Sequence, residues 1–139
     1  MTQTSRSPLE EAAERVGDRW TLLIVAALLE GPRRFSDLSD SLPGIAPNIL
    51  SQRLKHLETE SVIVARPYSQ RPLRLAYELT ASGAGLAGAL RLLEGWAAAS
   101  KGGGTPRHDL CGTPLEARWY CPTCARPAGD GADEDLRFL

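Results

Sequence analysis

Residues 33–79 constrain the fold of this chain more than any other stretch, because the boundaries between their elements have local signals. Ser36 can cap a helix that ends near Leu42, and Pro43-Gly44-Ile45 breaks that helix. Pro47 favours the first turn of the next helix, which we expect over residues 47–58. The predicted order is therefore a short helix, a tight turn and a second helix.

Two strands joined by a turn follow this helix pair. Residues 62–66 are rich in β-branched side chains, residues 69–72 suit a turn, and residues 73–79 alternate as a returning strand. Residues 33–35 are too short for more than a single strand pairing. This order is the layout of a winged helix-turn-helix, so the predicted fold class is mainly α (α+β) and DNA binding is the first functional hypothesis.

Flanking helices complete the predicted domain. Ser7-Pro8-Leu9-Glu10 has the form of a capping box, so a helix should run over residues 8–16 and end at Gly17. Asp18 can cap the next helix, residues 19–30, which is apolar on nearly every side and therefore central. Thr80 can cap a final helix that reaches about residue 99.

The final helix has an apolar stripe at near-heptad spacing, formed by Leu86, Leu90, Leu93 and Trp96 or Ala97. We interpret it as a packing helix at a dimer interface. Lys101-Gly102-Gly103-Gly104-Thr105-Pro106 cannot hold a regular element. The predicted organisation is a DNA-binding and dimerisation domain at residues 8–99, a flexible linker at 100–106, and a small zinc-ribbon-like tail at 107–139.

Charge is distributed unevenly along a chain whose net charge is only -1. Residues 33–74 contain seven Arg or Lys against four Asp or Glu, a balance of +3. Residues 108–139 contain three Arg against six Asp or Glu, a balance of -3. A modest basic segment with an acidic tail suits a duplex-binding dimer better than a histone-like protein.

The longest apolar run, residues 22–29, is far shorter than the roughly 20 residues that a bilayer span needs. The first residues also lack a secretion signal. We expect a cytoplasmic protein without membrane contact.

The predicted recognition helix has two faces when about 100° of rotation is taken per residue. Leucines form the apolar face, and the polar face can donate and accept hydrogen bonds at base edges. The leucines are Leu50, Leu54 and Leu57, and the polar side chains are Asn48, Ser51, Gln52 and Lys55. An ordinary solvated face has the same composition, but the neighbouring turn and hairpin favour DNA contact.

Further DNA contacts are expected around this helix. Arg53 lies at the edge of the leucine face, where an ion pair with a nearby acid and a phosphate contact are both open. Arg71 and Arg74 can enter the minor groove, hold phosphate, or simply aid solubility. His56 is better explained by surface packing than by ligand binding. The complete predicted DNA-binding set is Arg34, Pro47, Asn48, Ser51, Gln52, Arg53, Lys55, Arg71 and Arg74.

The three cysteines cluster near the C-terminus with a histidine, as His108-x2-Cys111-x9-Cys121-x2-Cys124. Two closely spaced ligand pairs can converge tetrahedrally on Zn²⁺, so we predict one structural zinc ion per chain. The alternatives are reduced thiols without metal, or a Cys-x-x-Cys redox pair. A redox pair would leave His108 and Cys111 without a role. A closed four-ligand site has no open position for catalysis.

Several sequence blocks together indicate a family. They are Val16-Gly17-Asp18-Arg19-Trp20-Thr21-Leu22-Leu23-Ile24, Arg34-Phe35-Ser36-Asp37-Leu38, Leu42-Pro43-Gly44-Ile45, Leu50-Ser51-Gln52-Arg53-Leu54-Lys55 and Tyr77-Glu78-Leu79-Thr80-Ala81-Ser82-Gly83. Over roughly residues 9–96 the chain resembles the HxlR family of MarR-like bacterial and archaeal transcriptional regulators. The resemblance implies a homodimer built on the first and last helices, with one recognition helix and one wing per subunit on double-stranded DNA.

Two positions depart from the family pattern. Many members carry a cysteine just before the first helix, used by some as a redox sensor, whereas this chain has Ser7 in that region. Where the family often has Ser or Thr before the recognition-helix proline, this chain has Ala46, which removes an N-cap worth about 1 kcal/mol. Some members with similar tails carry a comparable His-Cys and Cys-Cys cluster.

The sequence thus predicts a homodimeric, sequence-specific transcriptional regulator. The alternatives are a zinc-containing protein-interaction module that binds a partner such as RNA polymerase, and a redox or metal sensor that uses Cys121 and Cys124. A small-molecule effector stays open as a further partner. We do not expect an enzyme, because the sequence has no evident nucleophile-base pair, phosphate loop or open metal site.

Overall fold

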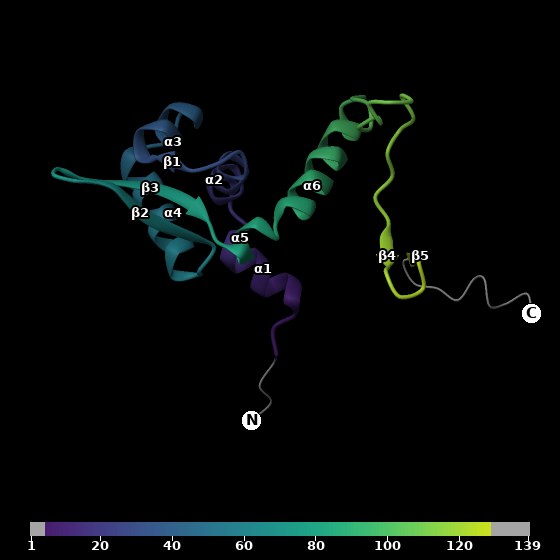
Figure 1. Ribbon diagram of the computed structural model, residues 1–139, viewed down its shortest axis with the longest axis horizontal. Helices are drawn as coiled ribbons and strands as arrows, with labels where there is room; N and C mark the ends of the chain where they lie inside the picture. Colours follow the sequence, from purple (N-terminus) through teal and green to yellow (C-terminus); the bar gives the residue numbers. More distant parts are fainter. Residues whose placement is uncertain (1–4, 129–139) are drawn as a thin grey trace, which may run out of the picture. The chain divides into compact units, whose positions relative to one another are not determined.

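The computed structural model describes residues 5–128 and divides the chain into two compact units, Met1–Arg91 and Leu92–Leu139. The acidic end of the predicted tail, residues 129–139, lies outside the described residues. The predicted domain limits stay a prediction. Figure 1 labels the helices and strands of both units.

Two capped helices begin the first unit, as predicted. Helix α1, Pro8–Val16, has the complete capping box: the Ser7 hydroxyl accepts from the Glu10 N–H at 3.2 Å, and the Glu10 carboxylate accepts from the Ser7 N–H at 2.6 Å. Helix α2, Arg19–Leu29, begins after Asp18, whose carboxylate accepts from the N–H groups of Trp20 and Thr21. These contacts satisfy helix N–H groups that have no partner within the helix.

The helix-turn-helix consists of α3, Phe35–Ser41, and α4, Pro47–Thr59. Ser36 is not the cap of α3, so that prediction was wrong. Arg34 occupies the N-cap position, and the Asp37 carboxylate accepts from its backbone N–H at 3.0 Å. Between the helices, Gly44 has φ +87°, a conformation that glycine adopts without a steric cost.

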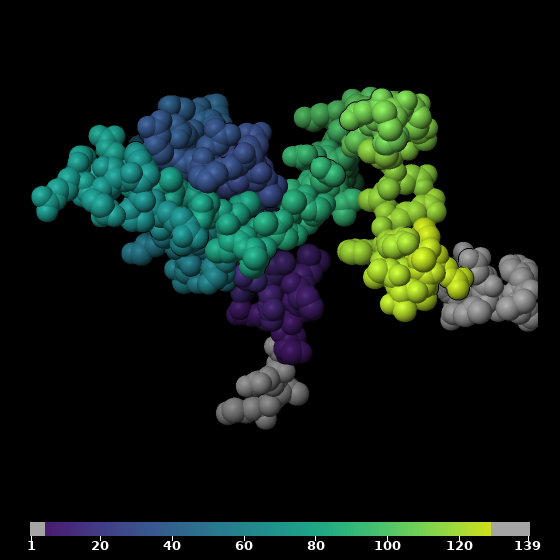
Figure 2. Space-filling view, in the orientation of Figure 1, coloured from purple at the N-terminus to yellow at the C-terminus, as the bar shows by residue number. Residues whose placement is uncertain are grey.

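The wing belongs to a three-stranded antiparallel sheet in the order β1-β3-β2. Its strands are β1, Arg33–Arg34, β2, Ile63–Gln70, and β3, Leu73–Leu79. Strand β2 is longer than predicted, and Arg71-Pro72 alone forms the turn. Pro67 interrupts the β-branched pattern, but β2 is an edge strand, where proline is tolerated, so the strand continues past residue 66. Figure 2 shows the β2–β3 hairpin, in teal, protruding from the first unit.

The single final helix was also predicted incorrectly. Thr80 caps α5, Ala81–Ala84, as expected, but Gly85 and Leu86 separate it from α6, Ala87–Ser100. A run that contains Gly83, Gly85 and Gly88 has low intrinsic helix stability, which permits this break. Gly83 is also required by packing, since a Cβ there would lie 2.1 Å from the Val62 carbonyl oxygen.

The core of the first unit lies between the helices and the sheet. Ile24 and Val25 of α2, Leu38 of α3, and Leu50, Leu54 and Leu57 of α4 are buried with Val62 and Ile63. The leucine face of α4 predicted from the sequence is therefore its core face. This packing fixes the rotation of α4 and leaves its polar face outward.

The second unit contains a short hairpin of β4, Trp119–Cys121, and β5, Arg126–Ala128, visible in yellow in Figure 1. Arg107 and Pro114 form an isolated antiparallel bridge earlier in the tail. Within residues 5–128, no helix is both long and apolar enough to cross a bilayer.

Candidate nucleic-acid interface

The outward face of α4 has exposed polar side chains that no other part of the described chain engages. Asn48, Ser51, Gln52 and Lys55 are all exposed, whereas Leu50 and Leu57 on the opposite face are completely buried. Within residues 5–128, these four polar side chains make no hydrogen bond or ion pair to the protein. The fold therefore presents hydrogen-bonding groups on a rigid helix without using them itself.

Arg53 has a different environment on the same helix. Its Nε atom is buried without a hydrogen-bond partner and lies 3.4 Å from Asp18 Oδ1. Desolvation raises the pKa of Asp18, but hydrogen bonds from Thr21 and Trp20 together with the charge of Arg53 outweigh it, so the pKa is lowered overall. Of the two alternatives that the sequence left open, the intramolecular pair is present, and it connects α4 to the start of α2.

Arg34 is also engaged within the protein. Its guanidinium donates to both carboxylate oxygens of Asp37 at 3.0 Å. Side-chain hydrogen bonds from Arg34, followed by its backbone N–H, lower the pKa of Asp37 to about 2. Arg33 forms a similar surface pair with Glu30 at 2.7 Å. Both arginines are therefore less available to an anion than an unpaired surface cation.

The end of the β2–β3 hairpin holds two cations that form no ion pair within the described part of the chain. Arg71 and Arg74 are exposed and form no ion pair within residues 5–128, whereas Arg66 pairs with Glu78. The Ser69 hydroxyl donates to the Pro72 carbonyl at 2.9 Å and closes the turn. The wing therefore holds one unpaired guanidinium group in its closed turn, that of Arg71, and a second one, that of Arg74, beside the turn in β3.

Tyr68 is a candidate contact that the sequence interpretation missed. It lies at the β-bulge between Pro67 and Ser69, and half of its surface is exposed. A bulge changes the direction of a side chain relative to the regular pleat. The available signal was an aromatic residue between the predicted strand, residues 62–66, and the predicted turn, residues 69–72.

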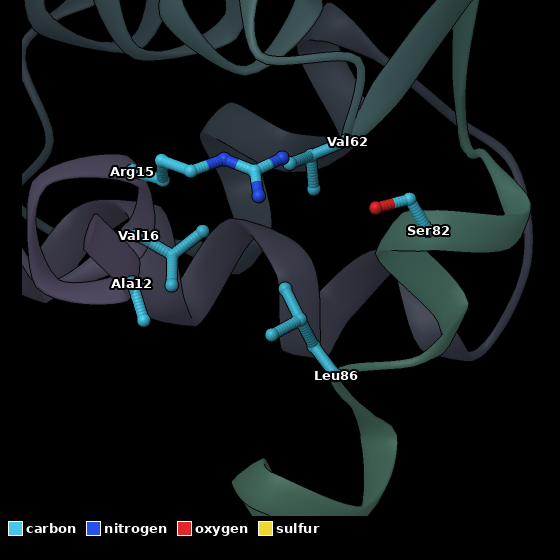
Figure 3. Close-up of a pocket in the computed structure, with 6 residues that line it drawn as sticks. All are labelled: Ala12, Arg15, Val16, Val62, Ser82 and Leu86. Carbon is cyan, nitrogen blue, oxygen red and sulfur yellow. The ribbon is translucent and has the colours of Figure 1, made fainter. Parts of the chain in front are cut away.

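His56 connects helices as a packed surface histidine. Its Nε2 atom lies 3.0 Å from the Arg15 carbonyl oxygen, and the Arg15 side chain pairs with Glu60 at 2.9 Å. These contacts join α1 to the end of α4. Next to them, a small recess open to solvent is lined by Ala12, Arg15, Val16, Val62, Ser82 and Leu86 (Figure 3).

The predicted zinc ligands occur as two local pairs in the second unit. His108 Nδ1 lies 3.3 Å from Cys111 Sγ, whereas Cys121 ends β4 and Cys124 lies in the β4–β5 turn. Hydrogen bonds with the side chain and the backbone of Thr113 lower the pKa of the Cys111 thiol, and a hydrogen bond with the Cys124 backbone lowers the pKa of the Cys121 thiol. Among the described residues, no three His, Cys, Asp or Glu side chains are grouped to hold a metal ion.

The described residues thus combine a helix pair, a hairpin wing and a polar face of α4 whose side chains make no hydrogen bond or ion pair among those residues. The model of the HxlR-like helix-turn-helix family matches residues 15–102 of the chain. The chain belongs to this family. The match covers the whole interface and ends before the cysteine cluster, so the tail lies outside it.

Relatives of this HxlR-like chain are transcriptional regulators rather than enzymes. It is 39% identical over 98 residues to YvaP of Bacillus subtilis, an alignment that covers 70% of this chain and 91% of the relative. It is 31% identical over 97 residues to the HTH-type transcriptional regulator YodB of the same organism, covering 70% and 87%. A Mycobacterium tuberculosis relative, Rv3095, is 38% identical over 118 residues, covering 81% and 74%.

Solved structures agree with this assignment. The crystal structure of the transcriptional regulator YtcD has a TM-score of 0.65 and 34% identity, covering 70% of this chain and 99% of that one. Reduced YodB from Bacillus subtilis has a TM-score of 0.60 and 31% identity, covering 67% and 92%. This HxlR-like chain is therefore a transcriptional regulator of the helix-turn-helix type with a winged-helix fold.

Proposed function

We propose that this regulator binds double-stranded DNA sequence-specifically as a homodimer, with α4 in the major groove and the β2–β3 wing on the flanking groove or backbone. The observation that carries the proposal is the outward face of α4. Its exposed polar side chains are unengaged within the described residues, and its leucine face is fixed in the core.

The chemistry of this face suits base edges. An amide such as Gln52 or Asn48 can pair bidentately with adenine, and the Ser51 hydroxyl can donate or accept at any base. Lys55 adds a cation on the same surface that can reach phosphate or guanine. In this proposal Asn48, Ser51 and Gln52 read sequence, and Lys55 adds affinity.

The surrounding residues have supporting roles. Arg71 in the exposed wing turn and Arg74 beside it in β3 contact phosphate or enter the minor groove. Arg53, paired with Asp18, positions α4, and Pro47 starts the helix whose first N–H groups face the backbone of DNA. Arg34 can bind phosphate only if its guanidinium leaves Asp37. We therefore expect a substitution of Arg34 to have a smaller effect on DNA affinity.

Two apolar helix faces support a homodimer. Helix α1 has no buried residue, and its Leu9 is 78% exposed. In α6, Leu93 is also exposed and Trp96 is 73% exposed. A second copy covering these faces would remove apolar surface from water, and its two-fold symmetry would match a pseudo-palindromic operator.

A pair of double variants with equal charge changes tests the proposal. Operator fragments selected by the wild-type protein are titrated with Lys55→Ala/Arg71→Ala and with Lys101→Ala/Arg126→Ala. Each double variant loses two positive charges, but only the first loses them from the proposed interface. We expect the first to lose at least tenfold in affinity and the second to stay within about twofold.

The protein-interaction alternative predicts another outcome. A regulator that acts only through a protein partner would show no saturable binding to selected duplex DNA. Equal losses in the two double variants would show that general charge, and not this surface, determines binding. Either result would contradict the proposal.

A further inference from the structure

The tail contains two turns of the same construction, although they have different sequences. In the first turn, His108 and Cys111 are three residues apart and Gly112 follows at φ +69°. In the second turn, Cys121 and Cys124 have the same spacing and Ala125 follows at φ +53°. Each turn therefore holds two side chains of types that can bind a metal, followed by a residue in the left-handed conformation.

Backbone contacts show that each turn closes a small antiparallel hairpin. In the first, the Gly112 N–H donates to the His108 carbonyl at 2.7 Å, and Arg107 bridges Pro114. In the second, Cys121 lies opposite Arg126 in the β4–β5 ladder. Two similar hairpins in one tail present two ligand pairs in the same local form.

Each turn also places its donor atoms favourably. His108 Nδ1 and Cys111 Sγ are already 3.3 Å apart. Cys121 ends β4, and Cys124 lies in the turn that follows it.

Hydrophobic burial does not explain why residues 101–128 form these turns. Every residue in this range is exposed except Cys121, which is half-buried, and Leu110 is 90% exposed. The left-handed backbone of Ala125 also costs about 1 kcal/mol, because a Cβ disfavours it. A fold with so little core needs another source of stability, and a structural metal is a common one in small units.

We propose that His108, Cys111, Cys121 and Cys124 bind one structural Zn²⁺ ion, with the two turns closing on it from opposite sides. Three sulfurs and one imidazole nitrogen form a donor set that zinc prefers and complete its tetrahedral shell. The structure groups these donors as two pairs and not as a set of four, so the proposal requires the two hairpins to approach each other. Zinc binding would release the protons of the three thiols to solvent.

The metal content of the full-length protein tests the proposal. The protein is purified with thiol reductant and without added metal, and bound metals are measured by elemental analysis. We expect about one zinc per chain in the wild type. Cys111→Ser, Cys121→Ser and Cys124→Ser should each lower bound zinc several-fold, whereas Asp109→Asn and Thr123→Ala, within the same two turns, should retain it.

Cobalt substitution separates the ligands by type. In the wild type, Co²⁺ should produce thiolate charge-transfer and tetrahedral d–d bands, and His108→Ala should change the d–d bands. An unchanged spectrum in His108→Ala would overturn the four-ligand assignment. Metal-free wild type that retains all three thiols, or that has a Cys121–Cys124 disulfide under reductant, would overturn the zinc site itself.

Discussion

Asp37 makes two contacts that determine how it titrates. Its carboxylate accepts from the Arg34 side chain and from the Arg34 backbone N–H, and these bonds lower its pKa from 3.8 to about 2. The charged form is therefore favoured in the folded state. Its contribution to stability is complete above the unfolded pKa and is lost as the pH falls toward the folded value.

Asp37→Asn tests this linkage. Above about pH 4, we expect the variant to be less stable than the wild type by a constant amount. Between about pH 4 and pH 2 the difference should shrink, because the wild type loses its carboxylate charge there. Urea denaturation at a series of pH values measures both free energies of unfolding. A difference that stays constant across this range would contradict the assignment.

At the level of residues, the sequence predicted well which side chains of α4 face outward. It predicted less well which side chains form ion pairs. The leucine and polar faces of α4 follow from periodicity alone, because helix geometry fixes them. The Arg53–Asp18 pair joins residues that are far apart in the sequence, so it depends on how α2 and α4 pack. Tyr68 was missed because its exposure depends on a bulge that no local pattern specifies.

The start of α4 has a weakness that both the sequence and the structure show. Ala46 occupies the N-cap position with extended backbone angles, φ -73° and ψ 143°, and supplies no side-chain acceptor. A serine in that conformation can accept from the first N–H groups of the helix. The backbone is therefore already suited to a better cap.

Ala46→Ser should raise the free energy of unfolding by about 1 kcal/mol. Ala13→Ser, an exposed position within α1, is the control and should lower it by a few tenths of a kcal/mol, because serine is a weaker helix former than alanine. Thermal and urea denaturation of both variants measure the changes. A loss of stability in Ala46→Ser would show that the start of α4 is held in another way.

At the level of elements, capping signals located most helix starts. Ser7, Asp18 and Thr80 cap the helices assigned to them, because each is a local side-chain contact with the next turn. Ser36 misled the prediction, since the Arg34–Asp37 contact starts α3 two residues earlier than a Ser36 cap implies. The close packing of Gly83 against the Val62 carbonyl joins positions far apart in the sequence, so the sequence alone does not reveal it.

The proposed dimer is tested by two tryptophans with similar exposure. Trp96 in α6 is 73% exposed and Trp119 in β4 is 69% exposed, but only Trp96 belongs to the proposed dimer face. Trp96→Ala should raise the dimer dissociation constant by about tenfold or more, and Trp119→Ala should leave it nearly unchanged. Sedimentation equilibrium measures both constants. Equal effects, or a wild type that stays monomeric, would contradict the dimer face.

In the whole molecule, we propose that two copies of α4 and the wing neutralise phosphates on one duplex. If each subunit contacts about four phosphates, a dimer contacts about eight, and the logarithm of affinity falls against the logarithm of salt concentration with a slope near -7. Lys55→Gln should reduce the slope by about 2 per dimer, while Lys101→Gln should leave it unchanged.

The salt dependence of wild-type binding to a selected operator is therefore the most direct test. For the wild type we expect the logarithm of affinity to fall against the logarithm of salt concentration with a slope near -7. This slope should become shallower in Lys55→Gln and stay the same in Lys101→Gln. A wild-type slope near zero, or the same slope in all three proteins, would contradict it.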